Sequence, residues 1–407
     1  EGYKKTKVGI VPGEWDVKQL KHILDQVERK VPKPQNGYWR LGLRSHAKGT
    51  FHEFIDDPNS IAMEELFSVA ENDLIVNITF AWEHAIALAN RDDEGKLVSH
   101  RFPTYVFNEK ACPYFYKYYV IQPHFKKMLS DISPGGAGRN RVMSKSSFRK
   151  LFAVLPPLPE QEKIAEILST WDKAIELKEQ LIAGKKQQKK WLMQNLLTGK
   201  IRLPGFTDEW QRVRLGEICR NVFGGGTPSR NIEHYYTGNI PWVTVKDLDG
   251  SKQKYDSSEH ISLEAVQQSA SKIIPKGNLI ISTRMGLGRG FINMVDMAIN
   301  QDLKGIILNG SVVSTEFVYY NFIELGSDLE RIGNGSTVKG IDLQTLLKLP
   351  INLPSLPEQK AIADILSTAD REIDLHEKQL EELKKQKKAL MQLLLTGIVR
   401  VSAQEVS

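Results

Sequence analysis

Apolar residues recur in alternating steps of four and three through two long stretches of the chain. In the first stretch these positions are 164, 168, 171, 175, 178, 182, 185, 189, 192 and 196, and seven of the ten are apolar. In the second stretch the equivalent positions carry Ile362, Leu366, Ala369, Ile373, Leu380, Leu383, Leu390 and Leu394, with His376 and Lys387 as exceptions. This spacing, sustained over more than three heptads, predicts two long amphipathic helices, each with a coiled-coil seam.

Residues that favour helix ends bracket both stretches. Pro159 and Pro357 stand where a first helical turn tolerates proline, and a glutamate follows each of them. Gly199 and Gly397 follow the last apolar positions and are typical of a C-terminal stop. A helix over residues 159–197 would be about 58 Å long at roughly 1.5 Å per residue.

The two stretches are copies of one another. Aligned without gaps, residues 155–203 and 353–401 agree at about 28 of 49 positions, and both carry LPxLPEQ, ILST, a lysine-rich run and LMQxLLTG. A fainter echo lies upstream, in VPGEWDVKQL around Trp15 and LPGFTDEWQRVRL around Trp210. The order of domain, helical arm, domain, helical arm indicates a tandem duplication.

A helix with one narrow apolar stripe needs a partner, and each arm is the obvious partner of the other. If the second arm returns beside the first, the pair is antiparallel and the duplicated halves are related by a pseudo-twofold axis. The alternative is that each arm folds back on its own domain through a break near Ala183–Gly184.

The globular parts have diverged more than the arms, but some elements recur in order. Residues 71–79 align with 276–284, 38–49 with 240–250, 98–107 with 299–308, and the Gly-rich 134–141 with 332–339. The α+β fold class follows, with two mixed α/β domains at 1–150 and 204–350 and helical regions at 151–203 and 351–407. Arms that stay alike while domains diverge are expected if the arms meet two copies of one partner. The alternative explanation is that the sequence of a coiled coil is less free to vary than the sequence of loops.

Composition narrows the class of protein. A chain of 407 residues with 41% hydrophobic and 26% charged residues favours two or more soluble domains. We expect no membrane span, no signal peptide and, with only Cys112 and Cys219, no disulfide framework, which favours the cytoplasm. The net charge of +6 permits a nucleic-acid partner without demonstrating one.

The repeated LPxLPEQxxIAxILST and LMQxLLTG motifs resemble those of the specificity subunits of type I restriction–modification enzymes. GGGTPSRNIEHYYTGNIPWVTVKDL at 224–248 is similar to the opening of that family's target recognition domains, and the first domain lacks this phrase. The resemblance covers nearly the whole chain. It implies a non-catalytic subunit that binds double-stranded DNA together with two methyltransferase subunits and restriction/translocase subunits.

The resemblance also implies that each target recognition domain reads one half of a bipartite, asymmetric site and that the helices act as a spacer. One turn of B-DNA is about 34 Å, so the helix pair could separate half-site centres by somewhat more than one turn. A change in helix length should then change the spacer. We expect no cofactor, no metal, no catalytic residues and no small-molecule substrate.

Polar residues beside predicted strands are the candidates for DNA contact, because Arg, Lys, Asn, Gln, Ser, Thr and His contact base edges and phosphates. Solvated hairpin tips and satisfied polar groups in buried strands are the alternatives. The candidates of the first domain are Arg44, His46, Lys48, Asn77, His84, Ser99, His100, Arg101, Arg139, Asn140 and Arg141. Those of the second domain are Thr227, Ser229, Arg230, Lys246, Arg284, Arg289, Asn300, Gln301, Thr337 and Lys339.

The arms carry a second set of candidates, for helix pairing or contact with partner subunits. These are Glu160, Gln161, Ile164, Leu168, Trp171, Ile175, Glu358, Gln359, Ile362, Leu366, Ile373 and Leu380. The glutamates and glutamines could serve only as helix-start residues or could contact the methyltransferase subunits. The lysine runs at 185–190 and 384–388 are more often a solvated helical face than a binding site.

Two other classes of protein are alternatives to a DNA-reading subunit. A stand-alone nuclease or methyltransferase is disfavoured, because the sequence contains no HNH cluster, no cofactor fingerprint and no metal spacing, and the missing Walker motifs exclude a nucleotidase or helicase. A coiled-coil adaptor that binds proteins without reading DNA is the remaining alternative. Salt dependence separates it from a DNA reader, since DNA binding falls steeply with salt.

Overall fold

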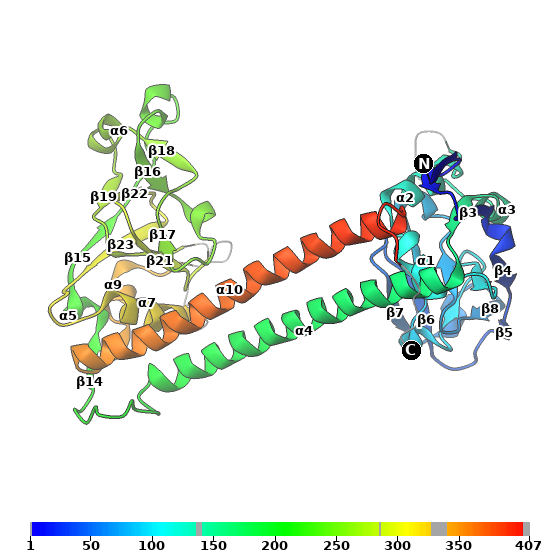
Figure 1. Cartoon of the computed structure of the whole chain (residues 1–407). Coiled ribbons are helices and arrows are strands. Elements are labelled where there is room, and N and C mark those ends of the chain that lie inside the picture. Colours follow the sequence, from blue (N-terminus) through cyan, green and yellow to red (C-terminus); the bar gives the residue numbers. More distant parts are fainter. Residues whose placement is uncertain (1, 136–140, 285, 327–339, 402–407) are drawn as a thin grey trace. The chain divides into compact units, whose positions relative to one another are not determined.

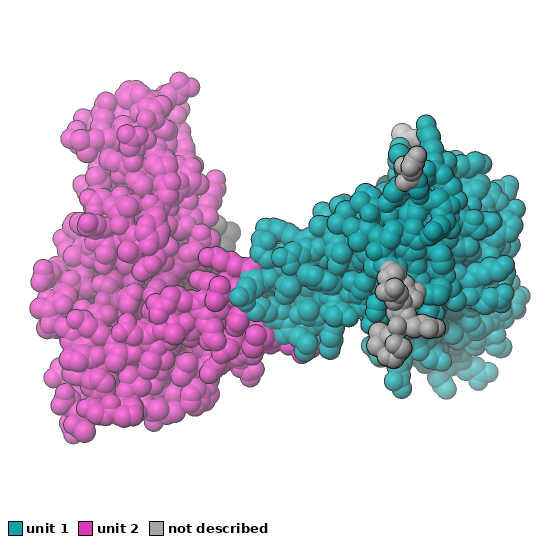
Figure 2. All heavy atoms as spheres, in the orientation of Figure 1, with its two compact units in different colours: residues 1–178, 379–407 teal, residues 179–378 magenta. Residues whose placement is uncertain are grey.

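A computed structural model of the chain describes residues 2–135, 141–284, 286–326 and 340–401. The chain divides into two compact units, which Figure 2 shows in separate colours. The first unit contains Glu1–Lys178 and Gln379–Ser407, and the second contains Glu179–Lys378. Each unit therefore combines one globular domain with a part of each long helix.

The two predicted helices are α4 (Leu158–Leu196) and α10 (Leu356–Leu395) in Figure 1. Every predicted seam position in both helices is buried or half-buried, which confirms the heptad interpretation. Helix α4 is continuous through Ala183 and Gly184, so the predicted alternative of a break there is wrong. Gly199 and Gly397 each have φ of 71°, the left-handed conformation that ends many helices.

Within each unit the two helices run antiparallel. In the first unit Lys387 pairs with Asp172, and Lys178 Nζ donates to Gln379 Oε1 at 2.6 Å. In the second unit the pairs are Lys185 with Glu372 at 2.7 Å, Lys186 with Glu377 at 2.6 Å, and Lys189 with Asp370. Residue numbers fall in one helix as they rise in the other. Lysines of both runs thus pair across the helices instead of facing only solvent.

The domain of the first unit contains two main sheets. We call the sheet with the order β10-β9-β12-β4 the inner sheet and the sheet with the order β5-β8-β11-β6-β7 the outer sheet. The strands are β1 (Tyr3–Thr6), β2 (Gly9–Pro12), β3 (Asp16–Gln19), β4 (Leu24–Val27), β5 (Lys30–Pro32), β6 (Tyr38–Leu43), β7 (Thr50–Ile55), β8 (Glu65–Ser68), β9 (Leu74–Val76), β10 (Ile86–Leu88), β11 (Leu97–Val98), β12 (Thr104–Phe107) and β13 (Phe152–Leu155). The helices are α1 (Pro113–Tyr119), α2 (Pro123–Asp131) and α3 (Lys145–Arg149), with short 3-10 turns between strands.

The domain of the second unit is built in the same way. Its inner sheet has the order β15-β23-β20-β21-β17, and its outer sheet has the order β18-β16-β22-β19. The strands are β14 (Gln211–Arg214), β15 (Cys219–Gly224), β16 (Ile240–Val243), β17 (Gln253–Lys254), β18 (Glu259–Ile261), β19 (Lys272–Ile274), β20 (Leu279–Ser282), β21 (Gly290–Asn293), β22 (Met297–Ile299), β23 (Leu303–Leu308) and β24 (Pro350–Leu353). The helices are α5 (Leu215–Ile218), α6 (Leu263–Gln267), α7 (Thr315–Glu324) and α9 (Leu343–Leu347).

The two domains share one topology. Strands β4, β12, β9 and β10 correspond in order to β15, β23, β20 and β21, and all these pairings are antiparallel. In the outer sheets, β7-β6-β11-β8 corresponds to β18-β16-β22-β19, with one parallel pair in each. The sequence alignments that placed β9 with β20, β6 with β16 and β12 with β23 are confirmed.

The start of each helix packs on the core of its own domain. Ile164 and Leu168 belong to one buried cluster with Trp15, Phe115 and the α10 residue Leu394. In the second unit, Ile362 and Leu366 cluster in the same way with domain residues and with the end of α4. Each core therefore contains the beginning of one helix and the end of the other, which fixes the domain to both.

A repeated polar cluster joins each domain to the helices. Tyr118 of α1 donates to Asp172 Oδ2 at 2.6 Å, and Tyr320 of α7 donates to Asp370 Oδ2 at 2.6 Å. Burial, together with the neighbouring carboxylate, raises the pKa of both tyrosines, so each hydroxyl remains a donor. The two aspartates hold equivalent positions of the repeat and each also pairs with a lysine of the other helix.

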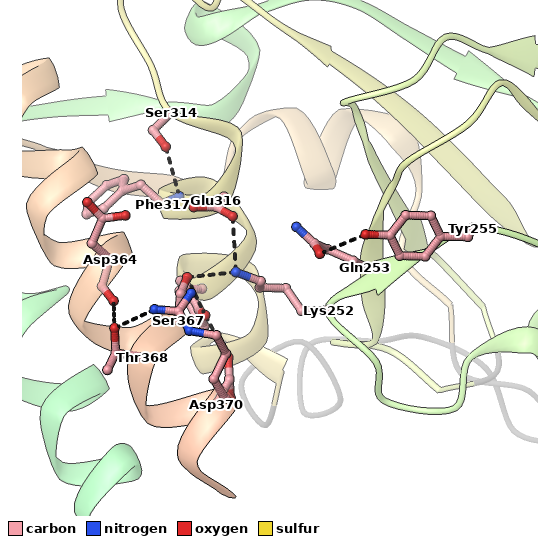
Figure 3. A network of polar contacts seen from close by, with 12 residues as sticks. Lys252, Gln253, Tyr255, Ser314, Glu316, Phe317, Asp364, Ser367, Thr368 and Asp370 are labelled. Atoms are coloured by element: carbon pink, nitrogen blue, oxygen red, sulfur yellow. Dashed lines mark hydrogen bonds and ion pairs between the residues drawn. The ribbon is translucent and has the colours of Figure 1, made fainter. Parts of the chain in front are cut away.

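Figure 3 shows the further contacts that the second unit adds at this junction. Lys252 Nζ, just before β17, donates to Glu316 Oε1 of α7 at 3.0 Å and to Ser367 Oγ of α10 at 2.7 Å. Ser367 is only 4% exposed, so this bond forms where water competes little. The strand, α7 and α10 are thereby held together.

Candidate nucleic-acid interface

Three loops of the first domain meet beside its outer sheet. They are residues 44–49 after β6, 77–85 after β9 and 99–103 after β11. His46 N donates to Glu83 O and Ala47 N donates to His84 O, both at 2.8 Å, while Ile78 N donates to Arg101 O at 3.0 Å. These backbone bonds join the loops into one surface.

Side chains reinforce the surface and leave its cations exposed. Arg101 Nη1 donates to Thr79 Oγ1 at 3.0 Å, and the Arg141 guanidinium lies 5.3 Å from the centre of the Trp82 ring. Arg44 lies 5.4 Å from the centre of the Phe51 ring. The predicted residues that are exposed here are Arg44, His46, Lys48, His100 and Arg101, and Ser99 and Arg141 are half-buried. Positive charge and donors therefore gather on this face.

Two predicted residues of this domain are buried. His84 is 4% exposed and its Nε2 lies 2.7 Å from Val120 O, while burial lowers the pKa of the ring. Asn77 is 7% exposed, and its Oδ1 accepts from Thr79 N at 3.0 Å. His84 therefore stabilises the interior of the domain, because its ring is turned away from solvent. Asn77 shapes the loop that carries Thr79.

Sequence reasoning missed Thr79 and Phe80. Both follow Asn77 on the loop that meets Arg101, and Phe80 is 41% exposed. The only sequence indication of exposure is its place after β9, among residues that interrupt the strand pattern.

The loops of the second domain converge at the equivalent edge. Gly226 N donates to Ile299 O at 3.1 Å, and Thr227 Oγ1 donates to Gln301 Oε1 at 2.7 Å. Thr283 N donates to Asp302 O at 3.1 Å, which joins the loop after β20 to the loop after β22. The segment that follows β15 therefore lies against the loop after β22, which in turn bonds to the loop after β20.

Arginines mark the turn between β20 and β21. Arg284 and Arg289 are both exposed, and Arg284 Nη1 lies 3.4 Å from Asp302 Oδ1. Gly288 has φ of 78°, and a side chain there would collide with the backbone of Gly326 at 2.2 Å. Only glycine fits at this point, so the close approach of two backbones fixes the turn.

The remaining predicted residues of this domain differ in exposure. Asn300 is 5% exposed and its Nδ2 donates to Asp302 Oδ2 at 3.1 Å, so it holds the loop from inside. Arg230 pairs with Glu259 at 2.7 Å and stacks 4.2 Å from the Tyr236 ring centre. Thr227, Ser229, Lys246 and Gln301 are exposed. Arg139, Asn140, Thr337 and Lys339 lie outside the described residues.

The glutamate of each LPEQ motif is the centre of a buried cluster. Glu160, 4% exposed, accepts from Trp15 Nε1 at 2.9 Å and from Arg400 Nε at 2.7 Å. Glu358, fully buried, accepts from Trp210 Nε1 at 3.1 Å and from Arg202 Nε at 2.8 Å. We call these two sets the Trp–Glu–Arg clusters. In both, the arginine follows the end of the other helix.

The glutamine of each LPEQ motif is also buried and bonds to its own domain. Gln161 Oε1 accepts from Cys112 N at 2.8 Å, and Gln359 Oε1 accepts from Ser314 N at 2.9 Å. Both side chains are fully buried and donate to backbone carbonyls that precede their own helix. Burial of these side chains disfavours contact with a partner subunit, and their bonds to the domain add a role beyond the helix start that the sequence had suggested.

The described residues contain no group of three or more His, Cys, Asp or Glu side chains placed to hold a metal ion. Among the helices of the described chain, none is long and apolar enough to cross a membrane. The chemistry that these loop surfaces offer is hydrogen bonding and positive charge.

Comparison with known proteins gives one consistent family. Residues 12–184 and 207–385 each match the family model described as the type I restriction modification DNA specificity domain. A putative type I restriction enzyme MjaX specificity subunit from Methanocaldococcus jannaschii is 27% identical, over 98% of this chain and 97% of its own length. The EcoR124I/EcoR124II specificity subunit from Escherichia coli is 32% identical over 60% of this chain and 64% of its own length.

Solved structures agree on the fold. The HsdS subunit from Thermoanaerobacter tengcongensis is similar with a TM-score of 0.54 and 20% identity, covering 96% of this chain and 98% of that one. A chain from work on complex assembly and conformational transition of the type I R-M system gives a TM-score of 0.62 at 19% identity, covering 96% and 99%.

Proposed function

The chain belongs to the family of type I restriction–modification specificity subunits, and we propose that it is the DNA-reading subunit of such an enzyme. Each globular domain reads one half of a bipartite, asymmetric DNA site. The subunit is not itself catalytic, and it brings DNA to subunits that modify or cleave it.

One observation carries this proposal. The two domains share one topology, but their equivalent loops present different side chains. The loops after β6, β9 and β11 carry Arg44, Thr79 and Arg101, whereas the equivalent loops of the second domain carry Lys246, Arg284 and Gln301. Arginine pairs with the guanine edge and glutamine with the adenine edge in the major groove. Unlike side chains on like scaffolds support two half-sites of different sequence.

We further propose that two methyltransferase subunits bind the chain and that restriction subunits join through them. The repeat supports this number, because residues 155–203 and 353–401 are two copies of one helical arm that share about 28 of 49 side chains. A structural relative comes from work on type I complex assembly, which fits a scaffold role.

Expressing the chain with its methyltransferase partner and sequencing the methylated positions of the host tests the proposal. The expected motif has two specified halves, of different sequence, separated by an unspecified gap. A single uninterrupted motif, or methylation that does not depend on the chain, would overturn it.

Mobility shifts of the same complex separate DNA reading from a protein adaptor. Affinity should fall by about 10³–10⁵ between 50 and 200 mM salt if six to ten phosphates are contacted. Arg284→Ala should weaken binding, whereas Arg371→Ala, which removes an exposed arginine of α10, should not. Salt-independent assembly without DNA would favour the adaptor.

A further inference from the structure

The first domain contains a cavity of about 350 Å³ beside its loop surface. Tyr38, Arg40 and Gly42 alternate along β6 and so face the same side of the outer sheet, where they line the cavity. The loops after β9 and β11 form the rest of the wall. Pockets for small ligands occupy roughly 300–1,000 Å³, so this cavity is large enough for one planar ring system.

The walls are aromatic and the edge is cationic. Phe51 and Phe80 line the cavity while remaining 37% and 41% exposed. Arg40 and Arg101 also line it and are exposed. Exposed aromatic rings next to arginines are the arrangement that holds an unstacked base and its flanking phosphates.

Two polar groups in the cavity wall are open to a ligand, and one of them is buried without a partner. Tyr38 is 7% exposed, and its hydroxyl has no hydrogen-bond partner among the described residues. Asn77 also lines the cavity, and its Oδ1 accepts from Thr79 N at 3.0 Å, which leaves its amide nitrogen available to a ligand. Buried polar groups are rarely left unpaired, because each carries its full desolvation cost. Their place in the cavity wall indicates a ligand with hydrogen-bonding edges.

The second domain uses the equivalent place differently. There the Gly-rich segment after β15 lies on the end of β22, and Gly226 N donates to Ile299 O at 3.1 Å. A side chain at Gly225 would lie 2.0 Å from Ile299 O, so the contact requires glycine. In the first domain the chain after β4 instead forms β5, which pairs with β8. The end of β11, equivalent to β22, lines the cavity through Val98.

We propose that this cavity receives one nucleobase, unstacked from the DNA that the first domain reads. The base lies between Phe51 and Phe80, and its polar edge bonds to the Tyr38 hydroxyl and the Asn77 amide. Arg101, which is oriented by Thr79, meets the backbone beside it. The inference rests on the proposed function, since the base comes from DNA held by the same loops.

A mismatch scan of the half-site read by the first domain tests the proposal. Each base pair is replaced in turn by a mismatch that keeps one base of the pair, and binding of the assembled complex is measured. Unpairing costs less at a mismatch, so a protein that extrudes a base binds a mismatch there more tightly. The expected result is about tenfold tighter binding at one position that is not the methylated base, which the methyltransferase extrudes itself, and weaker binding at the remaining positions.

Two variants connect that position to the cavity. Tyr38→Phe removes only the unpartnered hydroxyl, so the melting temperature should stay the same or rise while base preference at that position falls about tenfold. Phe80→Ala should remove the mismatch effect there, whereas Phe54→Ala, which changes an exposed ring of β7 outside the cavity lining, should not. The half-site of the second domain is the internal control.

The outcomes are distinct. Retained specific binding with no tightened mismatch position in the first half-site would overturn the inference and leave the proposed function standing. Unchanged base preference in Tyr38→Phe would also overturn it. Binding of free adenosine or thymidine to the cavity, without any mismatch effect, would show that the ligand is not a base of the bound DNA. Loss of all specific binding by the wild-type complex would instead count against the proposed function.

Discussion

Replacing Glu160 by glutamine perturbs the first Trp–Glu–Arg cluster at its centre. The carboxylate accepts from Trp15 and, through both oxygens, from Arg400, at 2.7–2.9 Å. Glutamine keeps the volume but removes the charge and points an amide donor at one of these two donors. Because Trp15 is fully buried and Glu160 is 4% exposed, water cannot replace the lost bonds easily.

The size of the effect follows from the burial of each partner. Removing one member of a fully buried ion pair costs about 3–5 kcal/mol, and a hydrogen bond to a charged group contributes about 1.5–3 kcal/mol. The Arg400 side chain is 36% exposed and recovers part of its hydration. We therefore expect Glu160→Gln to lower the free energy of unfolding of the first unit by about 2–4 kcal/mol.

Hydrogen exchange read by mass spectrometry measures this loss unit by unit. Protection should fall in residues 3–19, at the start of α4 and in residues 396–401, while the domain of the second unit keeps its protection. Glu162→Gln is the matched control, since Glu162 is an exposed glutamate two residues further along the same helix. Equal protection in Glu160→Gln and Glu162→Gln would refute the reasoning.

Three more predictions concern stability and reactivity. Tyr118→Phe and Tyr320→Phe should each lower the free energy of unfolding by about 1–2 kcal/mol and so lower the urea midpoint. Tyr114→Phe, on the exposed face of α1, should leave the midpoint unchanged. Burial lowers the pKa of His84, while the unfolded chain takes up the proton near pH 6.5, so stability is full above that pH and falls below it. Urea midpoints at pH 7.5 and 5.5 should therefore differ less in His84→Asn than in the wild type. Burial raises the pKa of Cys219 from 9.0 to about 11, so its alkylation by iodoacetamide at pH 8, followed by mass spectrometry in a Cys112→Ser background, should be about a hundredfold slower than in the unfolded chain. Equal rates would contradict this.

Local patterns predicted the two long helices and a few matched strands because their causes are local. The heptad seam, the prolines near the helix starts and the glycines after the helix ends act over a few residues. Recurrence at matching positions then aligned β9 with β20 and β12 with β23, although the two domains share little sequence. Pattern and position together were sufficient to match these strands between the domains, whereas the strand order of each sheet came from the structure.

The Trp–Glu–Arg clusters show where sequence reasoning stopped. Both copies of the repeat contain the glutamate and the arginine, and nothing in the pattern says that Glu160 meets Arg400 and not Arg202. Glu160 lies in the first turn of α4 and Arg202 follows the end of that helix, so an unbroken helix of 39 residues (Leu158–Leu196) runs between them. Each glutamate therefore pairs with the arginine of the other copy, and this pairing can be inferred only once the helix is known to be unbroken.

Burial of polar side chains was the other limit. His84 and Asn300 interrupt apolar runs just as Arg101 and Arg284 do, yet the first two are buried and the second two are exposed. Within a turn, a polar side chain can satisfy the backbone or face solvent, and the choice depends on the neighbouring loops. Those neighbours come from distant parts of the chain, so the residue types alone do not decide.

The central claim is that the two domains read different halves of one DNA site. Methylated positions should be sequenced in hosts that express the methyltransferase partner with wild-type chain, with Arg44→Ala or with Arg284→Ala. We predict that the first variant relaxes one half of the motif and leaves the other intact, and that the second variant does the reverse. Relaxation of the same half by both variants, or an unchanged motif in both, would contradict the account.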